Sequence, residues 1–422
     1  MRGWTIVTAA RALIDSSPQL LPEVDSVARS WKRWERETTP SSFYRPLLAN
    51  LLDIEPAALA ARNPRKRAPI ERLVRDAVPA PQLLTDVTLA LTVPLAEDPA
   101  QISGRRVGLT DVGLIIEEIA HLRRLDNRYG SGRVRSRVVQ LLRREANTVR
   151  HGSYTEQTGR ALLSAVAQVS WLAGLMAADV GRHALAQRYY LQALNLAMGA
   201  EDQLYAASVL CHTSRLTAQL GHRTTTKRDR VRYGREAVAQ AHAGRNVANG
   251  AASPVLGALL CAVEARGHAL LGDVRATRTS VLDAQRHYER VRFGEEPTWL
   301  GFYSEAELAA DLGRCLRDVG RPEPAARLMT QALNGYEQWR VRSRCFVQTD
   351  LAAAQLIRRD FEQAAALGHE AVHAAAQVSS NRALDRLRVL QRQVRPLGVD
   401  SPPLRDLDDR ITDLFDHSRA GS

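Results

Sequence analysis

GRPEPAARLMTQA, residues 320–332, carries a spacing of side chains that recurs through most of this chain. A small residue stands five places after the first position, a larger apolar or small residue stands at nine, and alanine stands at twelve. The same spacing begins at Gly181, Asp229, Gly272 and Arg359. Units of this size cannot bury a core alone and must stack on one another, so the sequence predicts an all-α solenoid of helical repeats.

The first positions of these units lie 39 to 48 residues apart, whereas a tetratricopeptide unit has about 34 residues. We expect longer helices or loops to account for the excess, and GHRTTTKRD, residues 221–229, has the composition of an inserted segment. The small residues predict paired helices that approach closely. Stacked pairs form a curved surface of the kind that binds a peptide or a protein segment.

The composition favours helices but leaves the meaning of the charge open. Hydrophobic residues make up 45% of the 422 residues and aromatic residues only 5%, which suits closely packed helices better than a sheet. The formal net charge is +12, and only three of the 58 basic residues are lysine. This excess of arginine has two interpretations, which are the codon usage of a GC-rich genome and attraction to a polyanion such as nucleic acid.

The cysteines and the apolar segments indicate the compartment. Cys211, Cys261, Cys315 and Cys345 lie 30 to 54 residues apart without a CxxC pair or a Cys/His cluster. This spacing predicts buried, reduced thiols, with no disulfide framework, metal site or cofactor. No apolar run reaches 18 residues, so we expect a cytoplasmic protein without a membrane span.

The N-terminal segment departs from the repeat pattern. Apolar residues at helical spacing predict helices over residues 5–14, from about residue 25, and within FYRPLLANLLDI, residues 43–54. The second of these has Trp31 and Trp34 on one face and basic and hydroxyl side chains on the other. Two short helices of this kind are typical of a helix-turn-helix module, whose basic face enters the major groove of DNA. The predicted DNA-binding residues are Ser26, Arg29, Ser30, Lys32, Arg33, Arg36 and Ser41.

Residues 26–59, SVARSWKRWERETTPSSFYRPLLANLLDIEPAAL, resemble the second half of a Cro/repressor-like helix-turn-helix domain of the xenobiotic-response-element (XRE) type. In that family a Trp-Glu pair ends the recognition helix, a turn with proline follows, and a leucine-rich helix leads to an acidic-Pro-x-x-Leu ending. The matching residues are Trp34, Glu35, Pro40, Glu55, Pro56 and Leu59. The family's first helix has no counterpart, so we expect either a start upstream of Met1 or a reduced domain that binds DNA poorly.

Residues 159–197 are similar to the sensory half of actinobacterial regulators that join such a domain to C-terminal tetratricopeptide-like repeats. The resemblance implies a regulator that binds double-stranded DNA through the N-terminal module. Its array would dimerise or sense a peptide or protein effector, and we expect a homodimer. The alternative is an interaction scaffold that binds no DNA and whose N-terminal module is a helical cap.

The sequence predicts four regions. Residues 1–61 form the helix-turn-helix-like module, 62–108 a linker with weak helices, 109–395 the repeat array, and 396–422 a C-terminal tail. Within the linker, RNPRKRAP at residues 62–69 combines prolines with four basic side chains, which favours an exposed segment.

HEAVH, residues 369–373, matches the HExxH pattern of zinc proteases. A third ligand is missing, because no glutamate follows Glu370 and the only later histidine is His417. Ala371 is also the alanine at position twelve of the last repeat. The pattern is therefore interpreted as repeat packing, and we expect no enzyme activity, since no other catalytic set is present.

Overall fold

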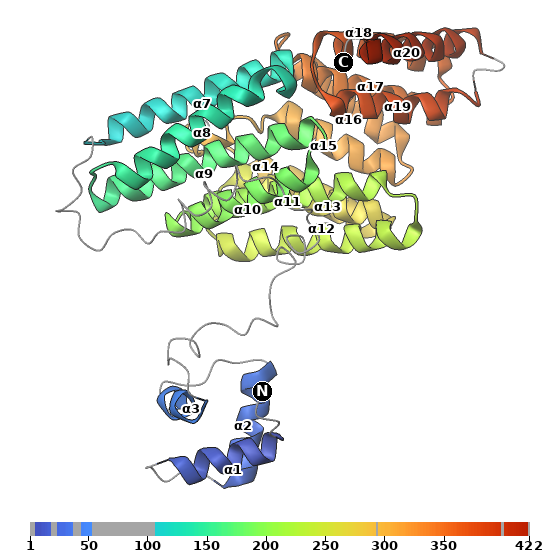
Figure 1. Cartoon of the computed structure of the whole chain (residues 1–422). Coiled ribbons are helices and arrows are strands. Elements are labelled where there is room, and N and C mark those ends of the chain that lie inside the picture. Colours follow the sequence, from blue (N-terminus) through green and yellow to red (C-terminus); the bar gives the residue numbers. More distant parts are fainter. Residues whose placement is uncertain are drawn as a thin grey trace. The chain divides into compact units, whose positions relative to one another are not determined.

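The computed structural model describes residues 5–17, 23–36, 44–52, 106–292, 294–397 and 401–420. The chain divides into two compact units, Met1–Asp76 and Ala77–Ser422. Every regular element in the described residues is a helix, so the predicted all-α fold is confirmed (Figure 1). The predicted linker lies almost wholly outside the described residues.

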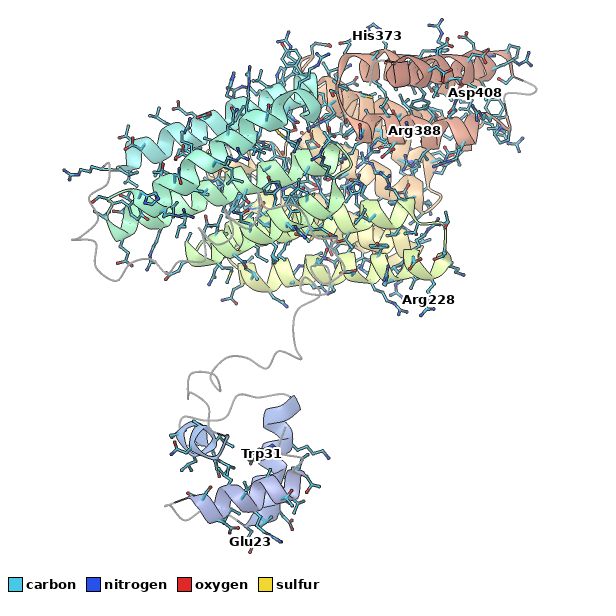
Figure 2. All side chains as sticks on the ribbon, in the orientation of Figure 1. Glu23, Trp31, Arg228, His373, Arg388 and Asp408 are labelled. Atoms are coloured by element: carbon cyan, nitrogen blue, oxygen red, sulfur yellow. The ribbon has the colours of Figure 1, made fainter. Side chains whose placement is uncertain are left out.

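The N-terminal unit contains α1 (Ile6–Ser16), α2 (Val24–Arg36) and α3 (Tyr44–Leu52). Thr5 caps α1, because its hydroxyl accepts a hydrogen bond from the backbone N–H of Thr8 at 3.2 Å. Trp31 of α2 packs into a small core (Figure 2). The buried members of this core are Ala9, Ala10, Leu13, Val27, Trp31 and Leu48.

The second unit is a stack of helical hairpins. Its helices are α7 (Leu109–Tyr129), α8 (Ser131–His151), α9 (Glu156–Asp179), α10 (His183–Gly199), α11 (Gln203–Arg223), α12 (Lys227–Ala248), α13 (Pro254–Leu271), α14 (Val274–Tyr288), α15 (Glu305–Asp318), α16 (Pro322–Gly335), α17 (Val341–Ile357), α18 (Phe361–Gln377), α19 (Asn381–Val394) and α20 (Pro402–Ala420), with a short 3-10 helix, η3 (Thr298–Leu300). Consecutive helices from α9 to α18 pack in pairs, which is the arrangement that the repeats predict.

The repeat positions lie on the second helix of each pair, where they face the first. Ala193, Ala241, Ala284, Ala332 and Ala371, all at position twelve, have no exposed surface. Small side chains at these positions let the paired helices approach closely. The turn residues Gly181, Gly272 and Gly320 have φ between 73° and 81°, and Arg359 stands at +62° in the same left-handed conformation.

The repeat that begins at Asp229 differs from the prediction. Asp229 is not a turn residue, because it lies in the first turn of α12, where its backbone N–H donates to the Thr226 hydroxyl at 3.1 Å. The supposed insertion at residues 221–229 is mostly helical, since α11 runs to Arg223 and α12 starts at Lys227. Longer helices, and not a longer loop, therefore account for the extra residues here.

The array also continues past residue 395, where the sequence places its end. Residues 402–420 form α20, whose apolar side chains are buried against α18 and α19. These side chains are Leu404, Leu407, Ile411 and Phe415. The region predicted as a C-terminal tail therefore contains a packed helix, and α20 is the last helix of the described array.

Two helices, α9 and α13, are long and apolar enough to cross a membrane. However, 83% and 78% of their apolar windows are buried inside the array, which is typical of the core helices of a soluble protein. The four cysteines are buried and unpaired, as the spacing predicts. Burial raises the pKa of Cys211 and of Cys345 to about 12, so these thiols stay protonated.

The array closes on itself, because its C-terminal helices meet its N-terminal ones. The loop between α18 and α19 lies against the turn between α7 and α8, where the Ser379 N–H donates to the Tyr129 carbonyl at 2.9 Å and the Gly132 N–H donates to the Ser379 carbonyl at 3.0 Å. The Ser380 hydroxyl donates to Asp179 at 2.8 Å. Residues more than 200 positions apart in sequence are thereby joined.

A buried ion pair lies at the same closure. The guanidinium of Arg342 on α17 donates to both carboxylate oxygens of Asp126 on α7, at 2.9 and 2.5 Å. Asp179 of α9 lies 3.6 Å from the same guanidinium. Burial alone would lower the pKa of Arg342, but Asp126 and Asp179 outweigh it and raise that pKa, so Arg342 keeps its charge.

We predict that Gly130→Ala destabilises the protein by about 2 kcal/mol. Gly130 has φ +85°, and an added Cβ would lie 2.5 Å from the backbone of Ser379. Gly113→Ala, in the middle of α7 with no atom within 4 Å of the added Cβ, should instead stabilise the protein by about 0.5–1 kcal/mol. Urea unfolding measures both changes, and equal effects of the two substitutions would contradict the closure.

We predict that Arg342→Met lowers the unfolding free energy by about 3–5 kcal/mol, because it leaves Asp126 charged, buried and unpaired. The control is Arg286→Met on α14, which removes an exposed ion pair with Asp283 and should change the unfolding free energy by under about 0.5 kcal/mol. Urea titrations followed by circular dichroism give both values. A loss below about 1 kcal/mol for Arg342→Met would show that this pair does not hold the closure.

Candidate functional site

The predicted DNA-binding residues lie on or after α2. Arg29 and Lys32 are exposed, and Ser26 and Ser30 are half-buried. Arg33 and Arg36 belong to α2, but their side chains, like that of Trp34, lie outside the described residues, and so does the whole of Ser41. The described part of α2 thus has two basic side chains in solvent.

The opposite face of α2 is buried. Val27 and Trp31 are 1% and 9% exposed and pack on α1 and α3. One face of α2 is therefore anchored in the core of the N-terminal unit, and the face with Arg29 and Lys32 is open. A helix presented in this way has the amphipathic form that major-groove reading requires.

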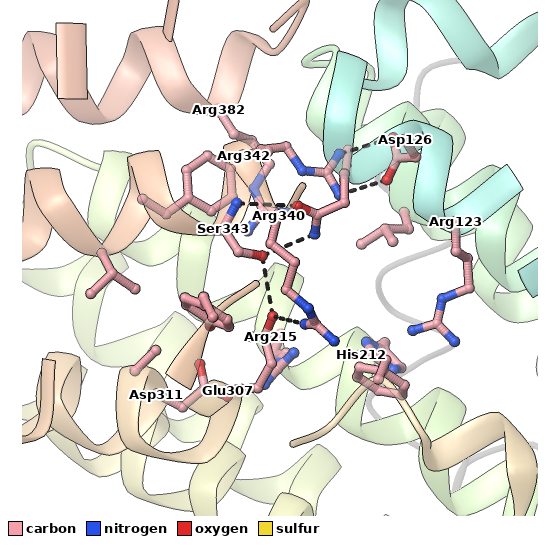
Figure 3. A pocket seen from close by; sticks show the side chains of 18 of the residues that line it. Arg123, Asp126, His212, Arg215, Glu307, Asp311, Arg340, Arg342, Ser343 and Arg382 are labelled. Carbon is pink, nitrogen blue, oxygen red and sulfur yellow. Dashed lines mark hydrogen bonds and ion pairs between the residues drawn. The ribbon is translucent and has the colours of Figure 1, made fainter. Parts of the chain in front are cut away.

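The second candidate site is a cavity of about 550 Å³ inside the closed array (Figure 3). Besides η3 and the loops that follow η3 and α16, its lining comes from α7, α9, α10, α11, α13, α15, α17 and α19. Most of these are the inner helices of their hairpins. The volume falls within the range of about 300–1,000 Å³ that is typical of small-molecule sites.

Positive charge is concentrated in this cavity. Nine arginines line it, namely Arg123, Arg124, Arg215, Arg266, Arg314, Arg340, Arg342, Arg382 and Arg386. The carboxylates of the lining are Asp126, Glu307, Asp311 and Glu337. Because the arginines outnumber the carboxylates by more than two to one, the carboxylates must be shared.

Asp311 on α15 shows this sharing. It pairs with Arg215, and it accepts from Arg266 at 3.1 Å and from Arg314 at 3.4 Å. The Tyr303 hydroxyl donates to the same carboxylate at 3.3 Å. One negative charge thus faces three guanidinium groups from α11, α13 and α15.

Asp350 on α17, which is not part of the lining, is likewise shared by three arginines. It accepts from Arg314 at 2.7 Å, from Arg317 at 2.5 Å and from Arg386 at 2.6 Å. Burial alone would raise the pKa of Asp350, but the three arginines outweigh burial and hold that pKa well below its usual value. Asp350 is therefore ionised at neutral pH.

Glu307 on α15 is also engaged. It accepts from Arg340 and from the Ser343 hydroxyl, both at 3.2 Å (Figure 3). Arg340 in turn donates to Glu337 at 2.9 Å. Every carboxylate of the lining is therefore bound to at least one arginine.

Three arginines of the lining, Arg123 and Arg124 on α7 and Arg382 on α19, form no ion pair with any described residue. Arg123 instead lies over the rings of Trp171 and Phe302, at 4.9 and 4.4 Å from their centroids. Arg382 lies 5.0 Å from the ring centroid of Phe346. Burial lowers the pKa of Arg123 to about 10, which shows that its charge is poorly compensated here.

An aromatic cluster forms one side of the cavity. The ring centroids of Trp171 and His212 are 4.7 Å apart, and Phe302 lies within 6 Å of both. Burial, and then the nearby arginines Arg215, Arg123 and Arg382, hold the pKa of His212 well below its usual value. His212 is therefore a neutral imidazole at neutral pH.

Three buried nitrogen atoms of the lining have no hydrogen-bond partner among the described residues. They are Nε1 of Trp171, Nε2 of His212 and Nε of Arg215. Buried polar atoms are nearly always hydrogen-bonded, and each one left unpaired costs about 1–3 kcal/mol. Three such atoms lie around this cavity, where a bound group or a water molecule can complete their hydrogen bonds.

The sequence did not predict this cavity. Its arginines span residues 123 to 386 and belong to six helices and, for Arg340, to the loop before α17, so no local motif joins them. The one available signal was the excess of arginine over lysine, for which codon usage was an equal explanation. Only the closure of the array brings these side chains together.

The HEAVH segment lies on α18, away from the cavity lining. His369 Nε2 lies 3.2 Å from Asp406 of α20, Glu370 accepts from Gln348 at 2.8 Å, and His373 is exposed (Figure 2). Ala371 is fully buried, as repeat packing requires. Over the described ranges, no group of three His, Cys, Asp or Glu side chains is placed to hold a metal ion.

No protein-family model matches the chain, and no curated protein matches it in sequence.

We predict that the stability of the protein falls in acid partly through Asp350. A carboxyl group with a depressed folded-state pKa contributes stability that is complete above its unfolded pKa of about 3.8 and is lost as the pH falls toward the folded value. The unfolding free energy, measured in urea, should therefore drop below about pH 4, and less steeply for Asp350→Asn. The control Asp283→Asn, in an exposed pair, should keep the wild-type slope. Equal slopes for all three proteins would exclude Asp350 as the cause.

Proposed function

We propose that this chain is a DNA-binding transcriptional regulator with a ligand-receiving array. The N-terminal unit would bind double-stranded DNA through α2. The observation that carries the proposal is the presentation of α2, whose Trp31 face is buried on α1 and α3 while Arg29 and Lys32 are exposed. The similarity of residues 26–59 to XRE-type domains supports the same assignment.

On this proposal the residues of α2 have two roles. Arg29, Ser30 and Arg33 face base edges, where an arginine can donate two hydrogen bonds to a guanine. Lys32 and Arg36, with Ser41 beyond the helix, approach the phosphates. The phosphate contacts position the protein, and the base contacts give it sequence preference.

The array would be the regulatory part and would make the molecule a homodimer. It offers an internal cavity rather than a catalytic set, so we propose a receptor and not an enzyme. A regulator of this kind acts in the cytoplasm, which agrees with four reduced, buried thiols. A scaffold that binds no DNA would have no need of the basic face of α2.

We predict that Arg29→Ala weakens binding to a specific operator by about 1–3 kcal/mol if Arg29 reads a base. Lys32→Ala should weaken binding to all sequences and reduce the slope of log K against log salt by about 1. The operator would first be selected from genomic fragments with the full chain. Fluorescence anisotropy at several salt concentrations would then give both quantities.

The control is Arg11→Ala, because Arg11 is an exposed arginine of the same unit that lies on α1. In Arg11→Ala the DNA affinity and the slope of log K against log salt should both stay close to the wild-type values. If Arg29→Ala and Lys32→Ala bind as the wild type does, α2 is not the reading helix. If no fragment is selected at all, the scaffold alternative replaces the regulator.

A further inference from the structure

We propose that the cavity of the array binds a small organic anion that carries a flat ring, and that this anion is the signal of the regulator. The anion site follows from the cavity alone, whereas its role as a signal rests on the proposed function. The charge of the lining, its aromatic wall and its unpaired nitrogen atoms each favour such a ligand.

The charge requires an anion. Asp311 is shared by three arginines, Glu307 and Glu337 are bound to Arg340, and Asp126 is bound to Arg342. No carboxylate of the lining is left over for a cationic ligand. Arg123 and Arg382 reach the cavity without an ion pair inside the described residues, so a carboxylate or phosphate placed between these groups would gain charge-assisted hydrogen bonds.

The directions of the arginine pKa shifts agree with an anionic ligand. Burial lowers the pKa of Arg123 and of Arg382, and it lowers that of Arg386 to about 9 even though Asp350 lies beside it. By contrast, Asp126 and Asp179 raise the pKa of Arg342. The closure arginine is thus compensated, whereas these cavity arginines carry charge that a bound anion would stabilise.

The aromatic wall favours a flat ring. Trp171, His212 and Phe302 lie in mutual contact, and Arg123 covers the rings of Trp171 and Phe302. An aromatic ligand can stack on this group beside the guanidinium plane, which combines ring stacking with a cation–π contact.

The unpaired nitrogen atoms favour a ligand that accepts hydrogen bonds. The indole N–H of Trp171 and the Nε–H of Arg215 are donors, and both are buried without an acceptor among the described side chains and backbone. Trp171 and His212 are themselves only 4% and 3% exposed. Donors in this setting require an acceptor, and the oxygen atoms of an anionic group supply one.

The test uses the full chain and probes with matched chemistry. The first probe is the fluorescent anion 8-anilinonaphthalene-1-sulfonate, and its neutral twin is N-phenyl-1-naphthylamine, which has the same rings without the sulfonate. We expect saturable binding of the anion with one site per chain and at least about tenfold weaker binding of the neutral twin. Competition with 1-naphthoate, 1-naphthyl phosphate and inorganic phosphate then distinguishes a carboxylate from a phosphate ligand and tests the need for the ring.

The variants are Arg123→Gln and Arg382→Gln, chosen because neither arginine holds an ion pair of the described fold. Each should weaken binding of the sulfonate at least about tenfold while the neutral twin is unaffected. The matched control is Arg327→Gln on the exposed side of α16, which removes the same charge far from the cavity and should leave all affinities unchanged. Circular dichroism and urea midpoints equal to those of the wild type show that the variants remain folded.

Three outcomes overturn the site. They are equal affinity for the anion and its neutral twin, equal loss in Arg327→Gln and Arg123→Gln, and no saturable binding of any of the three ring-bearing anions. These measurements are made without DNA. If the probes bind as expected but no DNA fragment is selected, the proposed regulator fails and the anion site stands; if DNA is bound and the probes are not, the site fails alone.

Discussion

The structure of the array depends on one buried contact, the ion pair between Arg342 of α17 and Asp126 of α7. Around it, backbone hydrogen bonds join Ser379 to the turn between α7 and α8, and Ser380 binds Asp179. A stack of hairpins held only by neighbouring contacts would be an open superhelix. The contact between Arg342 and Asp126 instead joins the C-terminal part of the stack to its N-terminal part, so the array encloses a cavity.

Closure has an electrostatic consequence for the inner helices. Most of their arginines are largely shielded from bulk water and share the few carboxylates available, as Asp311 and Asp350 show. Arginine suits this role because its planar group donates several hydrogen bonds and loses its proton far less readily than lysine. The arginine bias of the chain therefore has a structural use in the cavity, whatever its genomic origin.

Much of the local structure could be predicted from sequence. The spacing of small residues places the second helix of each hairpin correctly, except at Asp229, where a longer helix moves the register. The pattern of apolar residues also predicts α1, α2 and α3. The end of the array was set too early, because the Asp- and Arg-rich outer face of α20 masks the apolar stripe at Leu404, Leu407, Ile411 and Phe415.

By itself, the sequence determined the helical class, the hairpin repeat, the buried thiols and the amphipathic form of α2, because each follows from the spacing of residues within a single helix or hairpin. The tertiary structure alone decided the closure and the cavity. Arg123, His212, Asp311, Arg342 and Arg382 lie far apart in sequence and share no motif. These residues come together because the small curvature of each hairpin adds up along the stack until its ends meet. A sequence pattern within one hairpin does not show that total curvature.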